Sequence, residues 1–108
     1  VGIDVEETKP IDLDDFRNYL TTDEWAAITR SDRPHATFLE YWTKKESVLK
    51  AYGQGLSVAL SNIHLRGELA ILYDEPWFLR EIRIAPNYKC YLATNNQDTD
   101  PNVENVSF

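Results

Sequence analysis

The sequence has little of three things: cysteine, positive charge and long apolar runs. Cys90 is the only cysteine, so no disulfide can form within the chain. The 11 lysines and arginines are outnumbered by 18 aspartates and glutamates, which gives a formal net charge of −7. This balance argues against a general binder of nucleic acid or of anionic membranes, because either requires a basic face. No segment resembles a signal peptide or a membrane span, so we expect a reducing, cytoplasmic setting.

What is present is enough apolar material for one compact core. The chain has 108 residues, of which 43% are hydrophobic and 12% aromatic. We therefore expect a single domain over residues 1–108, with a loop-rich tail from about residue 95. The sequence begins with Val1 in a strand-like run, and we expect it to be cut from, or to follow, something longer.

Local signals predict helices in the first half of the chain. An aspartate can cap a short helix over residues 12–20, and residues 21–24 have the spacing of a capping box for a second helix. Residues 35–52 contain no glycine or proline, and large apolar side chains recur there at helical spacing. This segment is the longest predicted helix, and Gly53 and Gly55 are expected to end it.

The second half has the pattern of antiparallel strands. Short apolar runs are separated by turn signals such as Glu75-Pro76 and Pro86-Asn87. The fold class we expect is therefore α+β, an antiparallel sheet packed against helices that include one long helix. The predicted strands of this half cover residues 63–66, 69–73, 78–84, 88–94 and 106–108.

The first six residues predict one more strand, with two carboxylates on one face. Apolar side chains alternate there with Gly2, Asp4 and Glu6. We expect the face that carries Ile3 and Val5 to be buried, and the carboxylate face to turn toward the middle of the long helix. A solvated sheet face is the alternative interpretation of the two carboxylates.

The long predicted helix contains a second unusual feature. Lys45 falls within its apolar stripe, where a lysine either has a function or extends along the stripe to water, and the sequence leaves both open. Glu46 lies one turn before Lys50, in the order of an i,i+4 pair that stabilises helices. Alone, such a pair is usually a surface feature worth about 0.3 to 0.5 kcal/mol.

Together, these two segments resemble the signature motifs of a known family. The first motif is GIDVE at residues 2–6, and the second is WTKKESVLKAYGQGL at residues 42–56. The pair is similar to that of the 4′-phosphopantetheinyl transferase superfamily, and the likeness extends from Val1 to about Thr94. It is closer to the surfactin-synthetase-activating type than to the short holo-acyl-carrier-protein synthases. The longer motif is the specific one, because Gly-Ile-Asp alone occurs by chance in many proteins.

The resemblance implies an enzyme that transfers 4′-phosphopantetheine from coenzyme A to a serine of an acyl or peptidyl carrier protein, with Mg²⁺ as cofactor, and releases 3′,5′-ADP. By position, Asp4, Glu6 and Glu46 correspond to carboxylates that hold Mg²⁺. Lys45 and Lys50 correspond to lysines near the phosphates of coenzyme A. The expected catalytic residues are Glu46, for the serine proton, and Lys50, for phosphate charge. Mg²⁺ suits this set because it is commonly held by a few carboxylates plus substrate phosphates.

The resemblance also implies partners. Enzymes of the surfactin type are pseudodimers with the ligand between two similar halves, so this chain would be the C-terminal, metal-carrying half. We expect an N-terminal half-domain or self-association, through an apolar surface, and no nucleic-acid or membrane partner. Carrier proteins are usually acidic, so we expect a local basic patch to receive them, with Arg30, Arg33 and Lys44 as candidates.

Two rival functions stay open. The chain could be a non-catalytic relative that keeps the fold and binds carrier proteins, although the intact Asp4, Glu6, Glu46 and Lys50 count against this. It could also be an unrelated Mg²⁺-dependent enzyme that hydrolyses phosphate esters.

Overall fold

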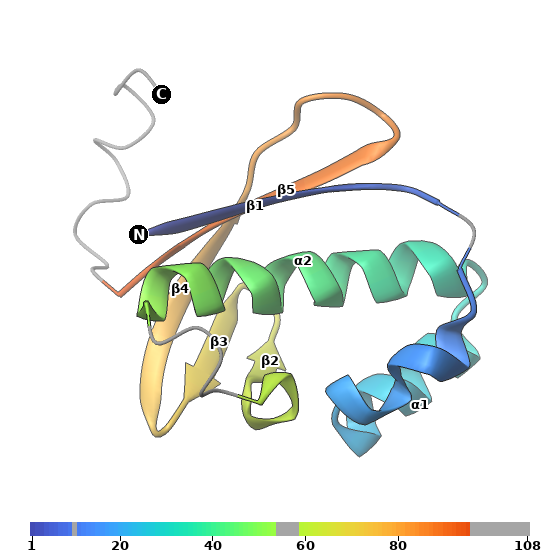
Figure 1. Cartoon of the computed structure of the whole chain (residues 1–108), viewed down its shortest axis with the longest axis horizontal. Coiled ribbons are helices and arrows are strands. Elements are labelled where there is room, and N and C mark those ends of the chain that lie inside the picture. The colour runs from blue at the N-terminus through green and yellow to red at the C-terminus, as the bar shows by residue number, and fades with distance from the viewer. Residues whose placement is uncertain (10, 54–58, 96–108) are drawn as a thin grey trace.

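The chain folds as an antiparallel sheet with a long helix along one face (Figure 1). The computed structural model describes residues 1–9, 11–53 and 59–95. The long helix is α2 (Pro34–Tyr52), and the five strands have the order β1-β5-β4-β3-β2. This is the predicted α+β arrangement. The strands are β1 (Gly2–Glu7), β2 (His64–Arg66), β3 (Leu69–Leu72), β4 (Glu75–Glu81) and β5 (Tyr88–Thr94).

Two shorter helices lie near the N-terminal end of α2 (Figure 1). The 3₁₀ helix η1 (Leu13–Tyr19) follows Asp12, whose side chain caps it. Helix α1 (Thr22–Arg30) begins with the predicted capping box. Its Glu24 backbone N–H donates to Thr21 Oγ1 at 3.2 Å, and the Thr21 N–H donates to Glu24 Oε1 at 2.9 Å. These contacts satisfy helix N–H groups that would otherwise have no partner.

Helix α2 has the predicted limits. Pro34 occupies its first turn, where its missing N–H costs nothing, and Gly53 ends it with a left-handed φ of 82°. The described residues contain no helix that is long and apolar enough to span a membrane. A second 3₁₀ helix, η3 (Leu60–Asn62), leads into β2. Gly55 and the strand predicted at residues 106–108 lie outside the described residues.

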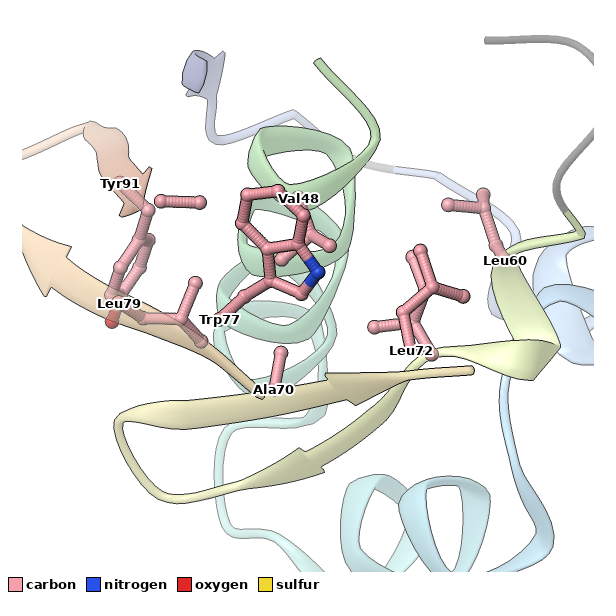
Figure 2. Packing of buried hydrophobic residues seen from close by; sticks show 9 residues of the cluster. Val48, Leu60, Ala70, Leu72, Trp77, Leu79 and Tyr91 are labelled. Atoms are coloured by element: carbon pink, nitrogen blue, oxygen red, sulfur yellow. The ribbon is translucent and has the colours of Figure 1, made fainter. Parts of the chain in front are cut away.

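The main core lies between α2 and the sheet. Figure 2 shows Val48 of α2 next to Trp77 of β4, at the centre of a buried cluster. A second cluster joins η1 and α1 to the first half of α2, and Trp42 packs against both clusters. The two cores are therefore connected through α2. The buried residues of the second cluster are Leu20, Ile28 and Phe38.

Strand β1 pairs with β5 and lies against α2, but its apolar face is not buried as predicted. Ile3 and Val5 are 38% and 47% exposed, whereas Gly2 and Asp4 are buried. The reason is that α2 covers the face of β1 that carries Asp4. The alternation was predicted correctly, and the assignment of its buried face was wrong.

Strand β4 is also displaced from its prediction, since it covers Glu75 to Glu81 rather than residues 78–84. Pro76 lies opposite Ile71 of β3, one position beyond the Leu72–Glu75 pair that closes the turn, and the pairing of β4 with β5 begins only at Phe78. The missing N–H of the proline therefore falls outside the β4–β5 ladder.

Candidate active site

Asp4 is the centre of the candidate site. Strand pleating points it toward α2, and it is only 3% exposed. Its Oδ1 accepts a hydrogen bond from Lys50 Nζ at 2.6 Å, while its Oδ2 is buried without a hydrogen-bond partner among the described residues. A buried carboxylate oxygen without a partner is costly. Oδ2 of Asp4 is therefore a buried acceptor that no contact within the described residues satisfies.

The other two predicted metal carboxylates lie near Asp4. Burial, a hydrogen bond to the Asp4 carboxyl and the charges of Asp4 and Glu46 raise the pKa of Glu6 to about 7, against the opposing effect of Lys50. A protonated Glu6 would donate to the Asp4 carboxyl, and without that proton Oδ2 of Asp4 has no donor among the described residues. Burial and the charge of Asp4 also raise the pKa of Glu46, again opposed by Lys50. Strand β1 and helix α2 thus bring together residues that the sequence separates by about forty positions.

Lys50 supplies the positive charge of this cluster. Its side chain is 53% exposed, so the ammonium is accessible from solvent while it contacts buried Asp4. The hydrogen bond to Asp4 is the main cause that raises the pKa of Lys50. Its ion pair reaches across to β1, whereas the sequence suggested an i,i+4 pair with Glu46.

The donor set fits a hard divalent cation only in part. Within residues 1–9, 11–53 and 59–95, no group of three or more His, Cys, Asp or Glu side chains is arranged to hold a metal ion by itself. The cluster nevertheless offers a buried oxygen without a partner on Asp4 and two carboxyl groups whose negative charge is disfavoured. Mg²⁺ is usually bound by one or two carboxylates, several waters and substrate phosphates. The chemistry of these residues therefore suits Mg²⁺ that is held jointly with a substrate.

Lys45, the other predicted phosphate contact, lies elsewhere. Its side chain is 0% exposed, and Nζ forms an ion pair with Glu24 Oε1 at 2.6 Å. The same ammonium donates to the Tyr19 carbonyl at 3.3 Å and to the Leu60 carbonyl at 3.0 Å. Lys45 therefore joins α2 to η1, α1 and η3, and all three of its protons have acceptors. The structure does not bring it to the Asp4 cluster.

Two further residues differ from expectation. Lys44, a candidate for an exposed basic patch, is only 5% exposed, so it cannot be part of such a patch in this structure. Its Nζ forms an ion pair with Glu40 at 3.0 Å and lies 5.3 Å from the centre of the Tyr91 ring. Glu24 was predicted only as a helix cap, and its pairing with Lys45 had no signal in the sequence because the two lie on different helices.

A cavity of about 150 Å³ opens beside the cluster. Glu6 borders it on the β1 side, and aromatic side chains from η1 and α2 form much of its wall. A group bound near the carboxylates would therefore also meet apolar surface. The aromatic lining residues are Phe16, Phe38 and Trp42.

Comparisons with known proteins agree with the sequence motifs. A family model described as the 4′-phosphopantetheinyl transferase superfamily matches residues 1–94, so the chain belongs to this family. The chain is 28% identical over 117 residues to the 4′-phosphopantetheinyl transferase Sfp of Bacillus subtilis, a match that covers 100% of the chain and 52% of Sfp. It is 29% identical over 113 residues to the 4′-phosphopantetheinyl transferase psf-1 of Bacillus pumilus, and this match covers 96% of the chain and 48% of psf-1. The chain thus spans about half the length of these relatives.

A solved structure supports the fold independently. The holo-[acyl-carrier-protein] synthase of Thermotoga maritima superposes with a TM-score of 0.69 at 17% sequence identity, and the match covers 85% of this chain and 60% of that one. At this identity the likeness concerns the fold. The predicted fold class, a 4′-phosphopantetheinyl transferase-like α+β fold, is confirmed.

Proposed function

We propose that this chain carries the metal- and phosphate-binding part of an enzyme that transfers 4′-phosphopantetheine from coenzyme A to a serine of an acyl or peptidyl carrier protein. Membership in the superfamily and the names of the relatives support this function. Within the proposal, Asp4, Glu6 and Glu46 hold Mg²⁺, and Lys50 contacts the phosphates. A cytoplasmic location belongs to the same proposal.

One observation carries the proposal: the carboxylates around Asp4 are not fully satisfied by contacts within the described residues. One Asp4 oxygen is paired with a solvent-accessible lysine, and the other is buried without a partner. Two more carboxyl groups lie close enough to disfavour one another's charge. A cation that arrives with a polyphosphate would satisfy the carboxylates, and Lys50 would face the phosphate. A merely structural ion pair would require neither Glu6 nor Glu46.

In the proposed transfer, the cation, Lys50 and Glu46 have separate roles. Bound Mg²⁺ would neutralise charge on the pyrophosphate of coenzyme A. Lys50 would hold a phosphate oxygen with its ammonium, which already lies at the edge of the cluster. Glu46 would accept the proton of the carrier serine, directly or through water.

The reaction is a substitution at phosphorus. The serine oxygen would form a bond to the β-phosphorus of coenzyme A, and the bond from that phosphorus to the bridging oxygen would break. The electron pair would leave with 3′,5′-ADP, and the serine proton would pass to Glu46 and then to solvent. The role predicted for Lys45 at the phosphates stays a prediction, and it would require the contact with Glu24 to open.

The test is to weigh a carrier protein after incubation with coenzyme A, Mg²⁺ and the chain in its complete assembly, that is, as a dimer or together with a second half-domain. We expect the carrier to gain one phosphopantetheine group, and we expect no gain when Mg²⁺ is chelated or when Asp4 is replaced in Asp4→Asn. Asp23→Asn, a change in another acidic residue away from the cluster, is the matched control and should keep the activity. Binding of the carrier without a mass change would support the non-catalytic rival. Cleavage of coenzyme A without a carrier would support a hydrolase.

The site is also proposed to need a second half-domain or a second copy of the chain. The chain spans about half the length of its relatives, and apolar side chains are exposed at Val1, just before β1, and at Ile3 and Val5 on one face of β1. Apolar surface of this kind, on the face of β1 opposite the carboxylates, suits a protein partner. Calorimetric titration of coenzyme A with Mg²⁺, run with light scattering, tests this. Micromolar binding by a monomer of the chain would contradict it.

A further inference from the structure

Strand β1 comes very close to helix α2 at Gly2. Gly2 is buried, and a methyl group added to it would overlap the backbone N of Ala51 and the backbone O of Ser47. The same methyl would lie 2.9 Å from Ala51 Cα. These are backbone atoms of two successive turns of α2, which cannot rotate away as a side chain can. No side chain therefore fits at position 2 while the two elements keep their present separation.

The helix is built for the same close approach. Ser47 is fully buried, and its hydroxyl donates to the Lys44 carbonyl at 2.7 Å, so the side chain folds back onto its own helix. Thr43, one turn earlier, does the same with the Leu39 carbonyl at 2.6 Å. Ala51 follows one turn later and has only a methyl group. The short side chains of Ser47 and Ala51, whose backbone atoms lie next to Gly2, let the backbone of β1 pack directly against the backbone of α2.

This contact lies directly beside the candidate site on both elements. Asp4 follows Gly2 by two residues, so the two share the face of β1 that meets α2. On α2, Glu46 immediately precedes Ser47, and Lys50 immediately precedes Ala51. The 2.6 Å bond between Asp4 Oδ1 and Lys50 Nζ spans the same gap that Gly2 sets. A displacement of about 1 Å would take this bond outside hydrogen-bonding distance.

We infer that Gly2 is a positioning residue: its missing side chain sets the spacing of β1 and α2 at which Asp4 meets Lys50 and Glu46. The inference rests on the proposed function only in treating this cluster as the reactive site. A purely structural role for Gly2 would predict lost stability with the Asp4–Lys50 contact unchanged. The two roles are separated by measuring that contact rather than stability alone.

The experiment is a double-mutant cycle between Asp4→Asn and Lys50→Met, read by urea unfolding in three backgrounds: native, Gly2→Ala and a control. In the native background we expect a favourable coupling between the two residues. In the Gly2→Ala background we expect this coupling to be lost within experimental error. The matched control background is Gly67→Ala, because position 67 has a positive φ of 62° and nothing within 4 Å of an added methyl. This control strains the backbone, and it should keep the full coupling.

An undiminished coupling in the Gly2→Ala background would overturn the inference, and so would an equal loss in both glycine backgrounds. If Gly2→Ala is unfolded in buffer, the same cycle is measured in trimethylamine N-oxide, which favours the folded state. The cycle needs neither metal nor substrate. A failure of the carrier-mass assay would therefore refute the proposed function and leave this result standing. Conversely, an active enzyme whose Gly2→Ala variant keeps both coupling and activity would refute the positioning role alone.

Discussion

Replacing Lys45 with methionine should destabilise the chain strongly. In the folded state the Lys45–Glu24 pair is almost free of water, with side-chain exposures of 0% and 7%. Removal of one partner of such a buried pair leaves an uncompensated charge and typically costs about 3 to 5 kcal/mol. A domain of this size has a total stability of about 5 to 15 kcal/mol, so Lys45→Met should lose a large share of it.

The structure also predicts which second change restores stability. Glu24→Gln removes the charge and keeps a side-chain oxygen for the Thr21 N–H, so the capping box survives. The double variant Lys45→Met with Glu24→Gln should recover about 2 kcal/mol of the loss, because no unpaired charge stays buried. Lys89→Met is the matched control. Its pair with Glu81 is about 30% exposed on both sides, and its loss should cost at most about 1 kcal/mol.

The assay is equilibrium unfolding in urea, which gives the free energy of unfolding for each variant. A loss below about 1 kcal/mol for Lys45→Met would refute the reasoning, since that value is typical of an exposed pair. No recovery in the double variant would refute it as well. A role of Lys45 at the phosphates alone would lower transfer activity and leave the unfolding free energy nearly unchanged.

Three further predictions concern the carboxylate cluster and one turn. We expect Mg²⁺ to raise the melting temperature of the native chain, and Glu46→Gln should abolish both this rise and transfer. Its metal-free melting temperature should stay equal or rise, because repulsion is relieved; a much lower metal-free value would make Glu46 structural. Without metal, the unfolding free energy should fall as pH rises from about 4.5 to about 7, because folded Glu6, whose pKa is about 7, holds its proton in that range and the unfolded chain does not. Glu6→Gln should remove this slope in urea titrations at several pH values, and an unchanged slope would contradict the assignment. Asp74 has a φ of 65° in the two-residue turn between β3 and β4, a conformation that glycine adopts at lower cost. Asp74→Gly should therefore raise the unfolding free energy by about 0.5 to 1 kcal/mol in urea titrations. A lower unfolding free energy would mean that the Asp74 side chain stabilises the turn.

The sequence predicted best what depends on near neighbours. The capping box at Thr21 and the end of α2 at Gly53 each involve residues within one turn of the chain, and both are confirmed. The motif pair indicated that Asp4 and Glu46 come together, and the structure places them close enough for the charge of Asp4 to raise the pKa of Glu46. Alternation showed that β1 has two different faces. It could not show which face the helix covers, because that depends on where α2 packs.

The burial of Lys44 and Lys45 could not be predicted from near neighbours in the sequence. Periodicity places Lys45 in the apolar stripe of α2, but its acceptors come from η1, α1 and η3, which are distant along the chain. Lys44 is covered because Gly67, in the turn between β2 and β3, accepts from its Nζ at 3.0 Å. Both outcomes follow from tertiary contacts, for which the local pattern of the helix carries no information.

The position of β1 has a consequence for how the chain behaves in solution. Within the part of the chain that the structure describes, β1 is an edge strand, and one of its faces is apolar. Exposed edges of this kind promote aggregation through strand pairing, and inward-pointing charged residues are one of the ways in which natural sheets oppose it. Asp4 and Glu6 occupy inward-pointing positions. The residues proposed to hold Mg²⁺ therefore also occupy positions that oppose misassembly, and removing their charge should make the chain more prone to form sheet-rich aggregates at concentrations where the native protein stays dispersed.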